Sequence, residues 1–227
     1  MNDFVVIFDM DGVIVNSEPL HQECEREIFR ELDISLTQEE HDRFLGVSGS
    51  DMWKQVIDRF DLKESVEYLV DIQNDCFIKK LEKSNPLPVI KGVKDLIKCL
   101  SENQIVLMLA SSSSQRVVNK VLTICHLKDY FKYIISGSDV LNSKPAPDIF
   151  LKAAKTGGVN PDHCIVIEDS DNGIEAARQA GMKVIGFLNG FNSEENVSEA
   201  DMIVSDFSEI SLRFLNDLVI KTLNNRG

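Results

Sequence analysis

Short runs of hydrophobic residues recur along the chain, and a polar or turn-forming segment follows each of them. The clearest runs are continuous and rich in Val, Ile and Leu: 4–8, 105–110, 164–167 and 184–187. Strands buried on both faces of a parallel sheet have this composition. Two shorter runs, 133–135 and 202–204, are weaker strand candidates.

Helical patterns occupy the intervals between most of these runs. Apolar residues at helical spacing predict helices over 93–102, 115–122, 148–155 and 173–180. Gly181 follows the last of them, at the position where a helix end favours glycine. Strands that alternate with helices are typical of βαβ units. The chain is therefore predicted to have an α/β fold with a Rossmann-like parallel sheet at its core.

One interval is too long for a simple crossover. A crossover connection needs only about a dozen residues or more, whereas the first two predicted strands are separated by the whole of 9–104. Thr37 and Glu40 form a capping-box pattern in this interval, and Pro19 suits the first turn of a helix. The helices predicted here cover 18–32, 50–60 and 65–81.

The junctions of this interval suggest an inserted domain. It begins at the end of the first strand, and Pro86 and Pro88 mark its return as a stiff linker. We therefore predict an all-helical cap domain over 16–87, inserted into an α/β core formed by 1–15 and 88–227. The alternative is that these helices extend one large core.

The charge of the chain restricts its partners. The 227 residues carry a net charge of −13, with 43% hydrophobic and 27% charged residues. This balance argues against nucleic acid and against an anionic membrane surface, both of which attract clustered Lys and Arg. A small anionic substrate stays possible, because a metal ion and a few placed cations can dominate a pocket. We expect a monomer or a weak homodimer.

Cysteine usage and the N-terminal residues favour a cytoplasmic location. The five cysteines are odd in number and have no metal-ligand or redox spacing: Cys24, Cys76, Cys99, Cys125 and Cys164. We interpret them as buried free thiols in a reducing compartment. The acidic Asp3 precedes the first strand without a basic, apolar leader, and no apolar run is long enough to span a bilayer.

Two carboxylates follow the first predicted strand, at Asp9 and Asp11. Residues two apart on an extended chain point to the same side, and ligands of open α/β sheets bind at the carboxyl ends of strands. Neighbouring carboxylates repel, so one can stay ionised as a nucleophile or metal ligand while the other exchanges protons. The alternative is an Asx-type turn that merely ends the strand.

A second acidic pair, Glu168 and Asp169, follows another hydrophobic run and precedes a helix. Together with Asp9, these oxygen donors suit a Mg²⁺ ion whose remaining ligands are water and substrate phosphate. The alternative is an acidic cap at a helix N-terminus.

Ser111 and Lys144 are candidates for holding a phosphate. Ser111 opens a run of four serines at a strand-to-helix turn, where hydroxyl and backbone N–H groups bind anions, although such a serine can also act only as an N-cap. Lys144 lies in Lys-Pro-Ala-Pro and could neutralise a transferring phosphoryl group, or it could be an ordinary surface lysine.

These segments occur in a set order along the chain: Phe-Asp-Met-Asp-Gly-Val at 8–13, then Ser111, Lys144-Pro145 and Glu168-Asp169. In this order the chain resembles the haloacid dehalogenase-like (HAD) hydrolase superfamily over nearly its whole length. It is most similar to the branch with a helical cap after the first strand, which includes sugar-phosphate phosphatases and β-phosphoglucomutase.

The resemblance implies roles for these residues. Asp9 would attack phosphorus and become an aspartyl-phosphate. Asp11 would act as acid and then base, and its backbone carbonyl would also bind Mg²⁺. Ser111, with Ser112, would bind phosphate. Lys144 would orient nucleophile and phosphate, and the metal would be held by Asp9, Asp11, Asp169 and the adjacent Glu168. A second aspartate separates the chain from true dehalogenases.

The cap gives a weaker indication of the substrate. The segment 45–48 resembles a cap loop of β-phosphoglucomutase, and His21 and Lys79 match a hinge-side histidine and a cap lysine that would contact substrate. However, Gly49 replaces the arginine that grips the distal phosphate in that enzyme, and other side chains replace an Arg fork poorly. His21 could equally be a core-edge residue of the cap, and Lys79 a plain surface lysine.

We therefore expect a Mg²⁺-dependent phosphatase that hydrolyses small phosphorylated metabolites, such as sugar phosphates. The first alternative is β-phosphoglucomutase. A remote alternative is a non-enzymatic phosphoacceptor domain, such as a signalling receiver, which also combines acidic residues, a Ser/Thr and a lysine on an α/β sheet.

Overall fold

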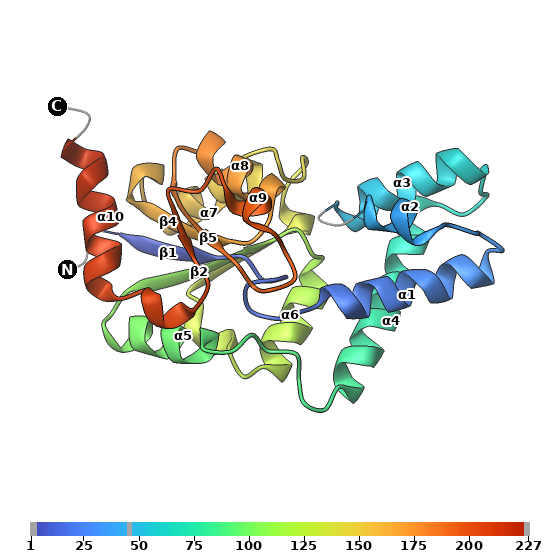
Figure 1. The fold of residues 1–227 in the computed structure, drawn as a ribbon, viewed down its shortest axis with the longest axis horizontal. Helices are drawn as coiled ribbons and strands as arrows, with labels where there is room; N and C mark the ends of the chain where they lie inside the picture. The colour runs from blue at the N-terminus through green and yellow to red at the C-terminus, as the bar shows by residue number, and fades with distance from the viewer. Residues whose placement is uncertain (1–3, 45–46, 225–227) are drawn as a thin grey trace. The chain divides into compact units, whose positions relative to one another are not determined.

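A computed structural model describes residues 4–44 and 47–224 of the chain (Figure 1). Its centre is a six-stranded parallel sheet in the order β3-β2-β1-β4-β5-β6. The strands are β1 (Val5–Phe8), β2 (Val106–Ser111), β3 (Tyr133–Ser136), β4 (Cys164–Glu168), β5 (Lys183–Phe187) and β6 (Met202–Val204). The prediction of a Rossmann-like parallel sheet is confirmed, and all six predicted runs form strands.

Strand β1 lies in the middle of the sheet because both of its edges pair in register. Val5 is opposite Val106 of β2 and Cys164 of β4. All four β1 residues are buried, so the strand has a helical layer on each face. The continuous hydrophobic run follows from this double burial.

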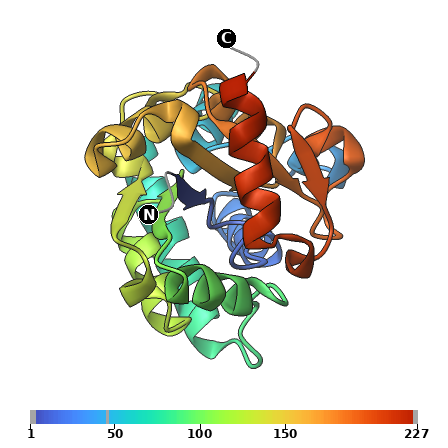
Figure 2. The same ribbon diagram turned by 90° about the vertical axis from the view of Figure 1, so that its left-hand side faces the viewer.

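Four long helices cover the sheet. They are α5 (Val93–Glu102), α6 (Gln115–Ile124), α7 (Asp148–Gly157) and α8 (Asp171–Gln179). Helices α7 and α8 contact one another and pack against β2 and β3 and against β4 and β5, respectively, while α5 and α6 lie on the opposite face (Figure 2). The predicted bounds of these helices differ by up to two residues from those of the structure. Helices α6 and α7 extend two residues beyond their predicted ends, and α8 begins two residues earlier, where the Ser170 hydroxyl caps it by accepting from Gly173 N.

The C-terminal part of the chain adds helices that the hydrophobic pattern did not lead us to predict. Helix α9 (Glu194–Val197) lies between β5 and β6, and α10 (Leu212–Asn224) follows β6. Helix α10 lies at the end of the sheet where the strands begin (Figures 1 and 2). Short 3-10 helices complete the described residues at Lys128–Tyr130, Gly137–Asp139, Pro161–His163 and Phe207–Glu209.

The chain divides into two compact units by its internal contacts. One comprises 1–16 and 89–227, and the other comprises 17–88. The division lies one residue from the predicted junctions. The second unit contains α1 (Glu18–Glu31), α2 (Gln38–Asp42), α3 (Gly49–Phe60) and α4 (Val66–Lys83). Within the described part of the chain, no helix is long and apolar enough to cross a membrane.

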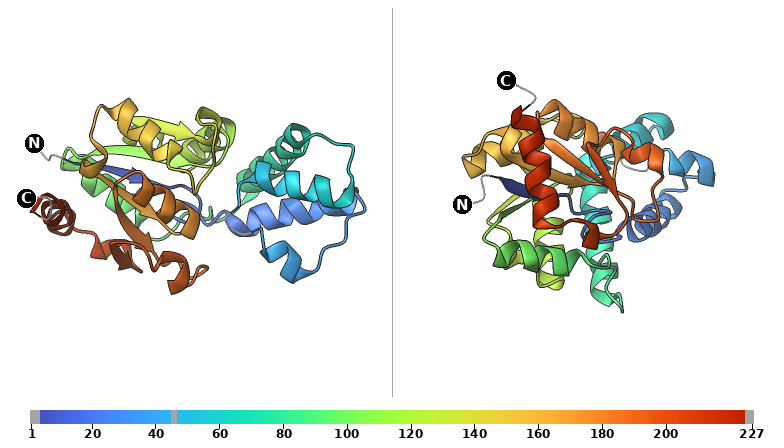
Figure 3. Two further views of the ribbon diagram at one scale, coloured as in Figure 1. Left: turned by 90° about the horizontal axis from the view of Figure 1, so that it is seen from above. Right: turned by 60° about the vertical axis from the view of Figure 1, so that its left-hand side comes forward.

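The helical unit has its own hydrophobic core. Helix α4 packs against both α1 and α3, so that the three long helices lie side by side (Figure 3). Buried side chains between them include Phe29, Trp53 and Leu69. The predicted capping box is present at α2, where Glu40 N donates to the Thr37 hydroxyl and Thr37 N donates to the Glu40 carboxylate.

A buried polar network also crosses this core. The Trp53 indole N–H donates to Gln73 Oε1 (2.7 Å), and Gln73 Nε2 donates to Glu25 Oε1 (2.8 Å). The other Glu25 oxygen lies 2.6 Å from His41 Nε2. Every member therefore has a partner, as buried polar groups require.

One prediction about the cysteines is wrong. Cys24 of α1 and Cys76 of α4 form a disulfide, with their Cα atoms 5.7 Å apart. Cys125 and Cys164 are buried free thiols, as predicted, whereas the free thiol Cys99 is exposed. The spacing of the cysteines did not predict this pair, because 52 residues separate its members and only the packing of α1 against α4 brings them together.

Removal of this disulfide is expected to destabilise the helical unit. A cross-link closing a 52-residue loop restricts the unfolded chain, and such a bond typically stabilises a fold by about 2–4 kcal/mol. The chain has one tryptophan, Trp53, which is fully buried in this unit. Its fluorescence in urea should show a lower unfolding midpoint for the reduced than for the oxidised protein.

The double variant Cys24→Ala/Cys76→Ala is the control, because its midpoint should not respond to the reductant. Equal midpoints for reduced and oxidised wild-type protein would contradict the expected stabilisation.

Candidate active site

The carboxyl ends of β1, β2 and β4 bring the predicted residues of the core together. Asp9 follows β1 directly, and its backbone N–H donates to Ile167 O of β4 (3.0 Å). Ser111 is the last residue of β2, and Glu168 is the last residue of β4. Because β2 and β4 flank β1, side chains from distant segments meet at one edge of the sheet.

Lys144 lies between two carboxylates at this edge. Its Nζ is 2.6 Å from Asp9 Oδ1 and 2.7 Å from Glu168 Oε1, and the side chain is only 7% exposed. It also donates to Ala110 O (3.4 Å) and lies over the ring of Phe150, 5.0 Å from its centroid. The surface-lysine alternative is therefore wrong: the ammonium group is held against the predicted nucleophile.

Glu168, the last residue of β4, is held by the turn that leads into α8. Its Oε2 atom accepts from the backbone N–H groups of Asp169 (2.7 Å) and Ser170 (2.9 Å) and from the Ser170 hydroxyl (3.0 Å). Gly173 makes room for this arrangement, because a Cβ there would lie 1.6 Å from Glu168 Oε1. Glu168 thus anchors Lys144 as well as contributing negative charge.

Asp11 faces the serine run. Its Oδ2 accepts from the hydroxyls of Ser113 (2.9 Å) and Ser111 (3.3 Å). The Ser111 hydroxyl also accepts from Ser113 N (3.1 Å). Ser112, predicted to bind phosphate, is exposed in the same turn, and its carbonyl passes so close to Gly137 that a Cβ there would be 2.2 Å away.

The carboxylate of Asp169 lies close to Gly12, in the turn after Asp11. Gly12 has a φ of +77°, and a Cβ on it would lie 2.0 Å from Asp169 Oδ2, so this backbone suits glycine alone. The same carboxylate oxygen accepts from Asn189 Nδ2 at 2.8 Å.

Burial and mutual repulsion oppose the ionisation of the carboxyl groups at this site. Burial raises the pKa of Asp9 to about 8; Lys144 opposes this shift, whereas Glu168 and Asp11 add to it. Burial, Glu168 and Asp9 together hold the pKa of Asp169 well above its usual range. Although burial alone would lower the pKa of Lys144, Asp9 and Glu168 raise it, so the lysine stays charged.

A divalent cation fits this cluster. Carboxylate oxygens of Asp9, Glu168 and Asp169 lie within 4.8 Å of one another. Hard oxygen donors in this number suit a small divalent ion, which would neutralise the charge that Lys144 leaves uncompensated. The Asp11 carboxylate is turned to the serines instead, so of Asp11 only the predicted backbone carbonyl stays a candidate ligand.

The predicted cap residues belong to the helical unit, and their role in binding substrate stays a prediction. The His21 ring stacks on Phe77, with centroids 4.2 Å apart, which fits the core-edge alternative. Lys79 is exposed on α4. The predicted cap loop at 45–48 begins with residues outside the described part of the chain, and Gly49 opens α3.

Three polar residues at this edge were missed as site residues. Ser113 belongs to the serine run, but only the structure shows that its hydroxyl reaches Asp11. Asn189 and Asn192 follow β5, and both donate to Asp169. The rule that ligands bind beyond the carboxyl ends of strands could have found them, since they follow a predicted strand.

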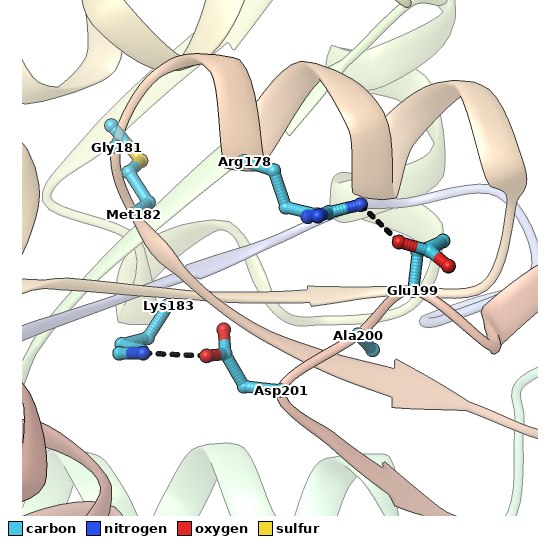
Figure 4. A pocket seen from close by; sticks show the side chains of 7 residues that line it. All are labelled: Arg178, Gly181, Met182, Lys183, Glu199, Ala200 and Asp201. Atoms are coloured by element: carbon cyan, nitrogen blue, oxygen red, sulfur yellow. Dashed lines mark hydrogen bonds and ion pairs between the residues drawn. The ribbon is translucent and has the colours of Figure 1, made fainter.

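A separate polar groove of about 360 Å³ lies at the start of β5. In it Arg178 pairs with Glu199 and Lys183 pairs with Asp201, each at 2.5 Å (Figure 4). Its charged groups neutralise each other, and none of the predicted site residues lines it.

Related proteins agree with the sequence motifs. The family described as haloacid dehalogenase-like hydrolase matches residues 6–187. The chain is 30% identical over 218 residues to a phosphorylated carbohydrates phosphatase of Thermotoga maritima, covering 94% of this chain and 99% of that protein. It is also 30% identical over 218 residues to the β-phosphoglucomutase of Bacillus subtilis, covering 93% of each.

A solved structure extends the likeness to the fold. The β-phosphoglucomutase of Clostridium difficile superposes with a TM-score of 0.85 at 24% identity, covering 99% of this chain and 100% of that one. The predicted resemblance is confirmed, and the receiver-domain alternative is set aside. The chain belongs to the haloacid dehalogenase-like hydrolase family.

Proposed function

We propose that this protein is a Mg²⁺-dependent phosphatase that hydrolyses small phosphorylated metabolites, sugar phosphates among them, through an aspartyl-phosphate at Asp9. The observation that carries the proposal is the contact of Lys144 with Asp9 and Glu168, beside the Asp169 carboxylate, which is a candidate cation ligand. A nucleophile, a fixed positive charge and a cation site at one edge are what phosphoryl transfer requires.

The first step would transfer the phosphoryl group to the protein. An Asp9 oxygen forms a bond to phosphorus as the bond between phosphorus and the substrate oxygen breaks, and the Asp11 carboxyl group gives a proton to that leaving oxygen. Lys144, 2.6 Å from Asp9, holds the nucleophile and opposes the charge of the transferring group. A bound divalent cation would add to this neutralisation.

The second step would release phosphate. Asp11, now ionised, takes a proton from water as the water oxygen forms a bond to phosphorus. The bond between phosphorus and the Asp9 oxygen breaks, which releases inorganic phosphate and restores the Asp9 carboxylate. The hydroxyls of Ser111 and Ser113 fix the orientation of the Asp11 carboxylate for both steps. These positions make Ser113 a further residue of the proposed machinery.

We assign the helical unit, 17–88, the role of a substrate-selecting cap. It is compact, has a hydrophobic core of its own and is inserted directly after the nucleophile's strand. The Thermotoga maritima relative is named for phosphatase activity on phosphorylated carbohydrates, which supports sugar phosphates as the substrate class.

A β-phosphoglucomutase is the second candidate, because the Bacillus subtilis relative carries that name at equal identity. Gly49 argues against it, since a mutase must hold a bisphosphorylated sugar at both ends and an Arg fork does this well. A coupled assay for glucose 6-phosphate formed from β-glucose 1-phosphate distinguishes the two. Conversion much faster than phosphate release would favour the mutase.

Purified protein with Mg²⁺ is expected to release inorganic phosphate from one or more members of a panel of sugar and polyol phosphates. A chelator should abolish the release and added Mg²⁺ should restore it, because the proposed reaction depends on a cation held by the carboxylates of Asp9, Glu168 and Asp169. Phosphate would be measured colorimetrically. Release from none of the esters in the presence of Mg²⁺, Mn²⁺ or Co²⁺ would contradict the proposed activity.

A further inference from the structure

The loop between β5 and α9 reaches across to the proposed cation site. Asn189 donates through its side-chain amide to Asp169 Oδ2 (2.8 Å) and to Gly12 O (3.0 Å). Asp169 follows β4, and Gly12 belongs to the turn after β1. One side chain therefore joins the two turns that carry the acidic residues of the site.

Asn189 is itself held rigidly for this task. Its Oδ1 accepts from the backbone N–H groups of Phe191 (2.8 Å) and Asn192 (3.1 Å), and its own N–H donates to Asn192 Oδ1 (3.0 Å). Both amide hydrogens and the amide oxygen are thus engaged, which leaves the side chain one orientation.

The hydrogen bond from Asn189 orients the carboxylate of Asp169. A neutral donor on Oδ2 restricts the rotation of this carboxylate without removing its charge. Partners of this kind orient metal ligands, and their loss typically lowers metal affinity or activity about 10–100-fold. Because Gly12 has no Cβ, the Asp169 carboxylate can lie against the turn after β1. The Asn189 amide therefore reaches both Asp169 Oδ2 and Gly12 O.

We propose that Asn189 is a positioning residue that sets the Asp169 carboxylate for a divalent cation before substrate arrives. The inference depends on the proposed cation site but not on phosphate transfer. It differs from a general loop-stabilising role, because the amide donates directly to the carboxylate.

The test is a calorimetric titration of the full-length protein with Mg²⁺ alone, repeated with Mn²⁺. Asn189→Ala should raise Kd by about 10-fold or more. Asn196→Ala is the matched control: Asn196 Oδ1 accepts from Ser193 N (3.0 Å) at the start of α9 but does not touch the site. Its Kd should stay within about twofold of wild type, since its contacts end at α9.

A second variant, Asn189→Ser, tests the inference even if Asn189→Ala does not fold. In Asn189→Ser the hydroxyl can still accept from a backbone N–H two residues on, but it is too short to donate to both Asp169 and Gly12. We expect the same rise in Kd, with a melting temperature close to wild type.

Turnover gives an independent readout. The Mg²⁺ concentration for half-maximal phosphate release should rise with Kd, whereas kcat at saturating Mg²⁺ should recover most of its wild-type value. If the substitution merely loosened the loop, the melting temperature would fall, but the Mg²⁺ requirement would not rise while kcat at saturating Mg²⁺ stayed near wild type.

Three results would overturn the inference: a Kd unchanged in both Asn189 variants, an equal rise in Asn196→Ala, or no binding of either ion to wild-type protein. If Mg²⁺ affinity depends on Asn189 as expected but the wild-type protein releases no phosphate, only the proposed phosphatase activity would be contradicted.

Discussion

Replacement of Asp9 by asparagine is expected to lower kcat for phosphate release by at least about four orders of magnitude, since losing a nucleophile has effects of this size or larger. Asparagine keeps the shape of the side chain but is a poor nucleophile. Lys144 would remain anchored by Glu168, so the surrounding site should keep its arrangement.

A trapping experiment separates this role from a loss of folding. Wild-type protein mixed with a radiolabelled phosphate ester and quenched in acid should carry label, and Asp9→Asn should carry none. Asp129→Asn is the matched control because that aspartate is exposed on a 3-10 helix away from the site. Residual turnover near wild type, or label on the Asp9→Asn protein, would remove Asp9 from its assigned role.

Replacement of Lys144 by methionine is expected to have the second-largest effect, because it acts on both stability and activity. The ammonium group pairs with two carboxylates that are 8% and 1% exposed. Removing one partner of a buried ion pair leaves uncompensated charge, which typically destabilises a fold by about 3–5 kcal/mol. Methionine retains most of the side chain's length, so packing against Phe150 should largely survive.

Urea denaturation in the presence of a chelator would measure this loss. Lys152→Met is the control, because Lys152 is exposed on α7. Mg²⁺ should restore part of the stability of Lys144→Met, since a cation also neutralises the carboxylates. Phosphate release should fall by about 10²–10³-fold even at saturating Mg²⁺, as when one preorganised donor is lost. A denaturation midpoint equal to that of Lys152→Met would show that the ion pairs contribute nothing.

The amino-acid sequence alone predicted the sheet and the main candidate site residues, for a physical reason. A strand buried on both faces must be continuously hydrophobic, so the first polar residue after such a run marks the carboxyl end of a strand. Asp9 and Glu168 were both found in this way, and Ser111, the last residue of β2, directly follows the run that predicted that strand. Their order along the chain then identified the family.

Other features could be decided only by the tertiary structure. The contact of Asp11 with Ser113 joins residues 102 positions apart, and that of Gly12 with Asn189 joins residues 177 apart. Neither asparagine nor serine shows by type alone which partner it binds. The same holds for Cys24 and Cys76. The sequence predicted free thiols, but the packing of α1 against α4 brings the two sulfurs together as a disulfide.

The sequence by itself therefore determined the fold class, the order of the strands along the chain and the chemistry available at their ends, because burial dictates residue type locally. The tertiary structure decided which polar groups meet: that Lys144 is held between Asp9 and Glu168, that the serine run orients Asp11, and that Asn189 holds Asp169. Such contacts depend on how strands are ordered in the sheet and how loops turn beyond it, and no local pattern of residues encodes these distances.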